Sequence, residues 1–370
     1  MRSSAFSTVL LSLGVTALPQ ALHVLEKSIS VGVQKPFSFP LANGFPNISL
    51  GSDALIEIQK QAHGTLPNGP LPAEISDNSA TVWQLIAFNE LFEVAYFSNL
   101  IENITDGVSG YELASPGALN VISTALEAVR AQEELHALGA NGILQAAGHD
   151  PINPCEYVFP VENLDSAINF ASVFTDIVLG TLQEALKILG ANGDEVDFLG
   201  LVGSVIGQEG EQNGFYRAFD KSAMPPSTQP LLTASSSPFL LSSLHQMVIV
   251  PGSCPNSLPI PVFGALNVDT RYPKAQTQDM KFSFYTNETN LKTEDLSLVY
   301  INQLNVPVVE ELSNVRIHEN QVHFTAHFPY QKNQMDGLTI AAVTNSVGPF
   351  SDASDVAAVT LYGPGIIEVA

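Results

Sequence analysis

The clearest hydrophobic pattern in the chain lies between about residues 115 and 147. Its apolar positions recur at steps of three and four residues, as on one face of a helix: Leu119, Ile122, Leu126, Val129, Ala140 and Ile143. Two polar residues, Glu133 and His136, stand on this stripe where the pattern requires apolar side chains. Burying a charge costs several kcal/mol unless it is paired, protonated or bound to a metal. Glu133 and His136 therefore need partners from elsewhere in the chain.

Three further segments show the same helical period, at about 81–101, 165–189 and 198–219. Ser115 and Pro116 give the helix over 115–147 a cap and a proline at its first position. The first and second helices, and the third and fourth, are joined by short connections, whereas a long Pro-rich segment joins the second to the third. This connectivity is typical of a four-helix bundle with one crossover. Another packing order of the four helices is the alternative.

Polar pairs interrupt three of the four apolar stripes near mid-length, each with a spacing of three residues: Glu90 and Glu93, Glu133 and His136, and Glu209 and Gln212. In an assembled bundle these pairs would form one buried layer. A dinuclear iron or manganese site in such a bundle uses one Glu from each of two helices and a Glu-x-x-His pair from each of the other two. The sequence therefore predicts a candidate metal site in this layer.

Beyond about residue 261 the hydrophobic pattern changes from the period of a helix to a period of two residues, which is that of a β-strand. The chain is therefore predicted to be an α+β multidomain protein, with a helical bundle followed by a small antiparallel β-sandwich of immunoglobulin-like size. Strands are expected near 281–285, 296–301, 321–328, 338–343 and 357–362. The expected units are a signal peptide at 1–17, an extended arm at 18–78 with one short helix near 53–62, the bundle at 79–222, a Pro/Ser-rich linker at 223–261 and the β-domain at 262–370.

Composition and targeting signals predict a secreted protein. The formal net charge of −23 argues against nucleic acid or an anionic membrane as partner. A basic start, an apolar run and a small-residue cleavage site form the signal peptide, and no later run is long enough to span a membrane. Secretion makes three glycosylation sequons relevant, at Asn47, Asn103 and Asn287. Cys155 and Cys254 could form a disulfide in an oxidising compartment, or remain two free thiols.

The stretches FTDIVLGTLQ and GSVIGQEGEQNGFYRAF, together with the secretion signal and the β-rich tail, resemble secreted fungal ferritin-like proteins. That family carries late-sexual-development and stress-response labels, and plant desiccation-related proteins are distant relatives. The resemblance implies metal ligands at Glu90, Glu133, His136 and Glu209, with Glu93 as an extra or alternative ligand. Two positions depart from the pattern: Thr175 stands in place of the carboxylate of the third helix, and Gln212 in place of a second histidine.

These departures leave two functions open. In the first, the layer holds one iron, manganese or zinc ion, with Gln212 or water completing its ligands, and any enzymatic activity is that of a metal-dependent oxidoreductase. In the second, the polar core is metal-free, and the protein is a non-catalytic extracellular or cell-wall component that contacts a partner through its β-domain. A hydrolase has little support, because the sequence shows no nucleophile elbow and no phosphate loop. The sequence predicts neither an oligomeric state nor a substrate.

Overall fold

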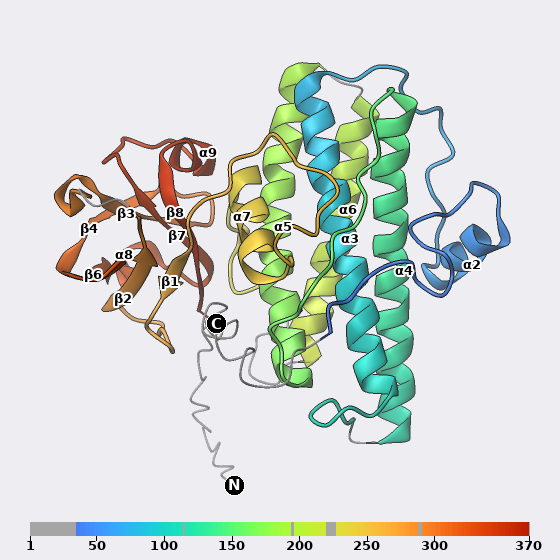
Figure 1. Cartoon of the computed structure of the whole chain (residues 1–370), viewed down its shortest axis with the longest axis horizontal. Helices are drawn as coiled ribbons and strands as arrows, with labels where there is room; N and C mark the ends of the chain where they lie inside the picture. Colours follow the sequence, from blue (N-terminus) through green and yellow to red (C-terminus); the bar gives the residue numbers. More distant parts are fainter. Residues whose placement is uncertain (1–34, 114, 194–195, 220–226, 288–290, 370) are drawn as a thin grey trace, which may run out of the picture.

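The structure, a computed structural model, describes residues 35–113, 115–193, 196–219, 227–287 and 291–369. It is an α+β protein with eight helices and two antiparallel four-stranded sheets in these residues. The long helices lie on one side of the molecule and the sheets on the other (Figure 1). The expected signal peptide, residues 1–17, lies outside the described residues.

Four long helices run side by side: α3 (Asp77–Thr105), α4 (Pro116–Ala146), α5 (Leu164–Asn192) and α6 (Val196–Phe219). Each covers the segment that the periodic pattern predicts. The pairs α3–α4, α5–α6 and α3–α5 pack closely along their lengths, whereas α4 and α6 have few close backbone approaches. The seam between α4 and α6 is therefore the loosest of the four.

Polar caps fix where the helices begin. Helix α3 starts four residues before the expected Thr81, because Ser76 Oγ accepts a hydrogen bond from Ser79 N at 3.2 Å. Ser115 caps α4 in the same way, as expected. At the start of α5, Asn163 and Ser166 form a reciprocal capping box. These caps lie outside the apolar stripes, so the stripes alone place helix ends only to within a few residues.

The irregular segments before and between the helices lie together on the helical layer. Helix α2 (Asp53–Gln61), found where the short helix is expected, packs against α4. Phe37, from the N-terminal arm, pairs with Tyr157 of the crossover, which also pairs with Ile249. Beside these bridges Cys155 and Cys254 form a disulfide that joins the crossover to the segment after α7.

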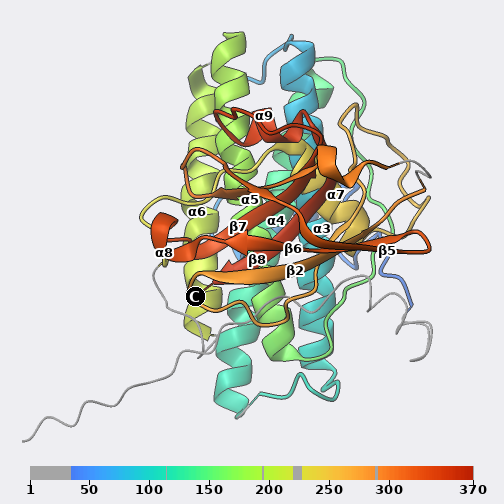
Figure 2. The same ribbon diagram turned by 90° about the vertical axis from the view of Figure 1, so that its left-hand side faces the viewer.

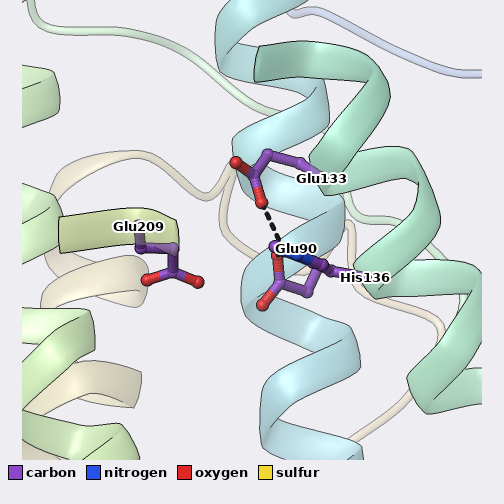
Figure 3. A group of neighbouring side chains, drawn as sticks. All are labelled: Glu90, Glu133, His136 and Glu209. Atoms are coloured by element: carbon purple, nitrogen blue, oxygen red, sulfur yellow. Dashed lines mark hydrogen bonds and ion pairs between the residues drawn. The ribbon is translucent and has the colours of Figure 1, made fainter. Parts of the chain in front are cut away.

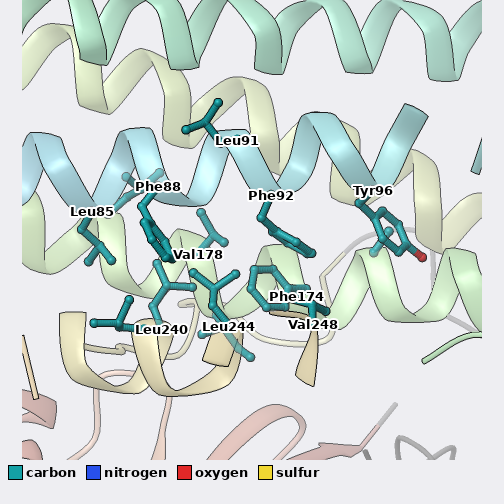
Figure 4. Close-up of a cluster of buried hydrophobic side chains, with 14 of the residues drawn as sticks. Leu85, Phe88, Leu91, Phe92, Tyr96, Phe174, Val178, Leu240, Leu244 and Val248 are labelled. Atoms are coloured by element: carbon teal, nitrogen blue, oxygen red, sulfur yellow. The ribbon is translucent and has the colours of Figure 1, made fainter. Parts of the chain in front are cut away.

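Helix α7 (Ser237–Met247) lies within the expected linker and packs in the core. Its leucines Leu240 and Leu244 point toward Phe88 of α3 and Val178 of α5 (Figure 4). Gln246 Nε2 on the same helix donates to the carbonyl oxygens of Phe263 and Gly363, at 3.0 and 2.9 Å. Helix α7 thus fills the space between the long helices and the sheets, so this part of the expected linker is packed, whereas residues 251–261 stay largely exposed.

The strands form two sheets with orders β1-β2-β6-β5 and β4-β3-β7-β8. Their bounds are β1 Leu266–Val268, β2 Gln278–Tyr285, β3 Ser297–Asn302, β4 Val308–Glu311, β5 Ser313–His318, β6 Gln321–Phe328, β7 Gly337–Thr344 and β8 Thr360–Val369. Side chains from both sheets share one apolar core, for example Phe282 and Phe324 from one sheet and Leu298 and Val343 from the other. The sheets lie in front of the long helices in Figure 2, and the second sheet contacts the helical layer through β7 and β8, which approach α5 and α7. Strands β3 and β7 are buried on both faces.

Four of the five expected strands coincide with β2, β3, β6 and β7. The expectation for residues 357–362 is wrong at its start, because helix α9 (Ala353–Ala357) precedes β8, which begins at Thr360. Strands β1, β4 and β5 were not expected. Strand β1 has three residues, and most of β5 is exposed, so neither shows an alternating apolar pattern. The remaining elements are short: a 3-10 turn at Thr293–Asp295 and helix α8 (Tyr330–Asn333).

Candidate metal centre

Four predicted ligands converge on one point between three helices. Glu90 comes from α3, Glu133 and His136 from α4, and Glu209 from α6 (Figure 3). One ligand atom from each side chain lies within 4.8 Å of one from every other. The three glutamates are no more than 1% exposed, while the His136 side chain is 17% exposed. The spacing of three residues along α4 places Glu133 and His136 on the same helix face, as expected.

Two neighbours satisfy Glu133. His136 Nδ1 lies 2.8 Å from Glu133 Oε2, and Gln212 Nε2 donates to Glu133 Oε1 at 2.6 Å. The same His136 nitrogen lies 3.5 Å from Glu90 Oε2. Tyr216 Oη donates to Gln212 Oε1 at 3.3 Å, which completes a chain of polar contacts into α6. Glu133 is therefore the most fully partnered carboxylate of the site.

Glu209 is the least partnered. Both of its carboxylate oxygens are buried and accept no hydrogen bond from any described residue. Neither oxygen of Glu90 accepts a hydrogen bond from a described residue; its Oε2 lies 3.5 Å from His136 Nδ1, and its carboxyl group is also within hydrogen-bonding reach of Glu133. A buried carboxylate without a hydrogen bond is strongly unfavourable when ionised. These oxygens are thus the part of the site that a proton or a cation would stabilise most.

Burial dominates the electrostatics. It raises the pKa of Glu90 to about 7, an effect that His136 partly offsets. Burial, together with repulsion from neighbouring carboxylates, raises the pKa of Glu93 and of Glu209 well above the ordinary value of 4.5. Burial alone would lower the pKa of His136, but attraction to Glu133 and Glu90 outweighs it and raises that pKa well above 6.5. In the metal-free site Glu90, Glu93 and Glu209 therefore hold protons at pH values where exposed glutamates are ionised.

The two other candidate ligands lie beside the group of four. Glu93 is 5% exposed, and its Oε1 accepts a hydrogen bond from Asn89 Nδ2 at 3.1 Å. Gln212 presents its amide nitrogen to Glu133. Helix α5 contributes no carboxylate to the group: Thr175 is buried, and the neighbouring Asp176 instead accepts a hydrogen bond from Asn213 Nδ2 at 2.9 Å. Asp176 therefore lies outside the group of four.

Three carboxylates and one imidazole form a donor set that suits a divalent iron, manganese or zinc ion. The group is compact enough for a single cation, because its ligand atoms lie within 4.8 Å of one another, and the oxygens of Glu90 and Glu209 accept no hydrogen bond from the described residues. A dinuclear site of the usual composition lacks its second histidine and the carboxylate of α5. The geometry thus favours one ion over two.

Sequence reasoning missed the amides of Gln132 and Gln208, which lie at the edge of the site. Gln208 Nε2 donates to Gln132 Oε1 at 2.8 Å, across the seam between α4 and α6. A signal for them was present, because each immediately precedes a candidate ligand and Gln208 shares a helix face with Gln212. The sequence analysis also missed Glu134, which is fully buried and accepts hydrogen bonds from Asn43 Nδ2 at 3.2 and 3.3 Å.

The predicted glycosylation sites differ in exposure. Asn47 is exposed, whereas Asn103 is half-buried and its Nδ2 donates to Asn99 Oδ1 at 3.2 Å. Asn287 is exposed, but the two following residues of its sequon lie outside the described residues. The side chain of Asn47 is therefore more accessible than that of Asn103.

A comparison with models of known protein families finds no match, and neither does a comparison with curated proteins. In the part of the chain that the structure describes, no helix combines the length and the apolar character needed to cross a bilayer.

Proposed function

We propose that α3–α6 form a ferritin-like bundle that holds one divalent metal ion on Glu90, Glu133, His136 and Glu209. In this proposal the protein is a secreted ferritin-like protein of fungal development or stress response. The buried Glu209 carboxylate, which accepts no hydrogen bond from the described residues, carries the proposal. A bound cation would compensate its charge and that of Glu90 at neutral pH.

The residues of the site would have different roles in binding the ion. Glu133 Oε1 accepts a hydrogen bond from Gln212 and its Oε2 lies 2.8 Å from His136 Nδ1, so the position of this carboxylate is fixed before a cation arrives. Glu90 and Glu209 face it from α3 and α6 and supply the uncompensated negative charge. A redox-active ion bound here would supply one-electron chemistry, which makes an oxidoreductase the enzymatic form of this proposal. The disulfide between Cys155 and Cys254 supports secretion, since disulfides persist in oxidising compartments.

The test is elemental analysis of the secreted protein beside two variants. Glu209→Gln keeps the size of the side chain and removes its charge, while Glu102→Gln makes the same change at an exposed position on α3. The proposal predicts about one iron, manganese or zinc ion per chain in the wild type and in Glu102→Gln, and a large loss in Glu209→Gln. A folded wild-type protein without metal, or equal metal in all three, would contradict it.

A second function is supported by the amide and phenol contacts of the site. Gln212 and His136 satisfy Glu133 without a cation, and Asn89 satisfies one oxygen of Glu93. A metal-free core with protonated Glu90 and Glu209 would then be structural, and the β-domain would make contacts with a cell-wall or protein partner. Protein from its native host that contains no metal, and whose unfolding temperature does not change when iron, manganese or zinc is added, would favour this function.

A further inference from the structure

We infer that Gln132, Gln208 and Gln212 form an amide gate between α4 and α6 through which a hydrated divalent cation enters the acidic site. This inference rests on the proposed metal-binding function. It assigns a role to Gln132 and Gln208, which lie outside the donor set, and to Gln212, whose amide nitrogen faces Glu133. It also predicts how the rate of binding, as distinct from its affinity, is controlled.

The gate lies at the loosest seam of the helical layer. Helices α3 and α4, α5 and α6, and α3 and α5 approach each other closely, whereas the side chains of Gln132, Gln208 and Gln212 bridge the α4–α6 seam. Gln132 extends from α4, and Gln208 and Gln212 extend from successive turns of α6. His136, one turn beyond Gln132 on the same face of α4, is the one partly exposed member of the donor set. The site therefore comes nearest to solvent beside this seam.

Hydrogen bonds connect the gate to the site. Gln208 Nε2 and Gln212 Nε2 both donate to Gln132 Oε1, at 2.8 and 3.1 Å. Gln212 Nε2 also donates to Glu133 Oε1 at 2.6 Å. Gln132 and Gln208 are half-buried, while Gln212 is 6% exposed. The amides thus form a continuous polar path from the edge of the seam to a buried ligand.

Amides are suited to passing a cation without holding it. A carboxylate at the seam would bind the cation, and an aliphatic side chain as long as glutamine would fill the seam and oppose the entry of the hydration shell, whereas alanine would leave room for water. An amide oxygen can replace one water of that shell, and the side chain can rotate when its hydrogen bonds break. Gln208 Oε1 is buried and has no hydrogen-bond partner among the described residues, so it is available for such a contact.

A rival route reaches the site from the other side. A narrow cavity with room for about one water molecule lies between α3, α5 and α7, and Asn89 and Glu90 are among its lining residues. Most of its wall is apolar, with Leu85, Val178 and Leu240 among the lining residues. Such a wall disfavours a hydrated cation, because it offers little to replace the water ligands. The seam between α4 and α6 is therefore the better route for an ion.

Stopped-flow mixing of metal-free protein with Co²⁺ tests the gate. The sole tryptophan, Trp83, is buried on α3 seven residues before Glu90, about 10 Å along the helix, so bound Co²⁺ should quench its fluorescence. The variants are Gln132→Ala, which removes the acceptor of two hydrogen bonds, and Gln208→Ala, which removes one donor. Gln145→Ala, at an exposed glutamine of α4, is the matched control.

The gate predicts that association and dissociation rate constants rise together, because a lower barrier speeds passage in both directions. Losing one hydrogen bond should accelerate both by about fivefold in Gln208→Ala, and losing two by about tenfold or more in Gln132→Ala. The dissociation constant, measured by equilibrium dialysis, should stay within about twofold of the wild type. Gln145→Ala should leave all three quantities unchanged.

Other results would overturn the inference in distinguishable ways. Cobalt binding with unchanged rate constants in Gln132→Ala and Gln208→Ala refutes the gate and leaves the proposed function standing. Equal acceleration in Gln145→Ala means that loosening of α4, and not the gate, controls entry. No cobalt binding by folded wild-type protein refutes the proposed function and the gate together.

Discussion

The metal-free protein should lose stability as the pH rises from 5 to 8, and Glu90 should cause a measurable part of that loss. Burial raises the pKa of Glu90 from 4.5 to about 7, so the folded state keeps a proton that the unfolded state releases. At pH values between the two pKa values of Glu90, 4.5 and about 7, the folded state binds more protons than the unfolded state, so stability falls as the pH increases. His136, whose pKa is also raised, acts in the same direction above pH 6.5.

The magnitude follows from the pKa of Glu90. Each pKa unit is equivalent to about 1.4 kcal/mol, so a rise from 4.5 to about 7 corresponds to about 3 kcal/mol of lost stability once Glu90 is ionised. Glu90→Gln removes the ionisation and nearly keeps the shape. Relative to the wild type, this variant should gain up to about 3 kcal/mol between pH 4.5 and pH 8.

Urea unfolding at several pH values, with a chelator present, measures this difference. Glu102→Gln on the same helix is the control, because that position is exposed and the substitution changes the net charge equally. Wild-type stability that is flat or rises from pH 5 to pH 8 would refute the reasoning. So would a Glu90→Gln variant whose stability falls with pH as steeply as that of the wild type.

Three further predictions test other parts of the structure. If the site binds metal, the rise in unfolding temperature on adding Co²⁺ should be larger at pH 8 than at pH 5, since protons compete for the carboxylates; a larger rise at pH 5 would contradict this. Because Cys155 and Cys254 are 99 residues apart, replacing both by serine should lower stability by about 4 to 5 kcal/mol in urea unfolding, and an unchanged midpoint would show that the loop is already ordered in the unfolded state. Gly180→Ala should lower the unfolding temperature, because the new Cβ would lie 2.3 Å from the carbonyl oxygen of Thr233. Gly203→Ala, at a position with open space around it, should instead stabilise α6 by up to about 1 kcal/mol. Equal effects of the two substitutions would refute the close approach at Gly180.

The polar layer could be predicted because its signal is local. Glu90, Glu133, His136 and Glu209 interrupt apolar stripes, and the helical period states which face each occupies. Burial of three stripes against one another then brings these residues together. The pairing inside the layer was not predictable, since the contact of Gln212 with Glu133 depends on the rotation of α6 relative to α4.

The sequence did not predict which residues are buried by segments that lie far away in the chain. Glu134 lies off the apolar stripe of α4, which would leave it exposed on an isolated helix. It is fully buried because the arm that carries Asn43, 91 residues earlier, covers it and donates to both of its oxygens. The same holds for β3 and β7, whose second faces are covered by the helical layer.

The sequence by itself determined the four long helices, the main strands and the residues that form the polar layer. Each of these follows from periodicity and caps within one segment, where the spacing of side chains is set by backbone geometry. Only the tertiary structure decided that α7 fills the core between helices and sheets, that Cys155 and Cys254 meet, and that Glu209 is left without a hydrogen bond among the described residues. These features depend on how separate segments pack, and no pattern within a single segment specifies the distance between two of them.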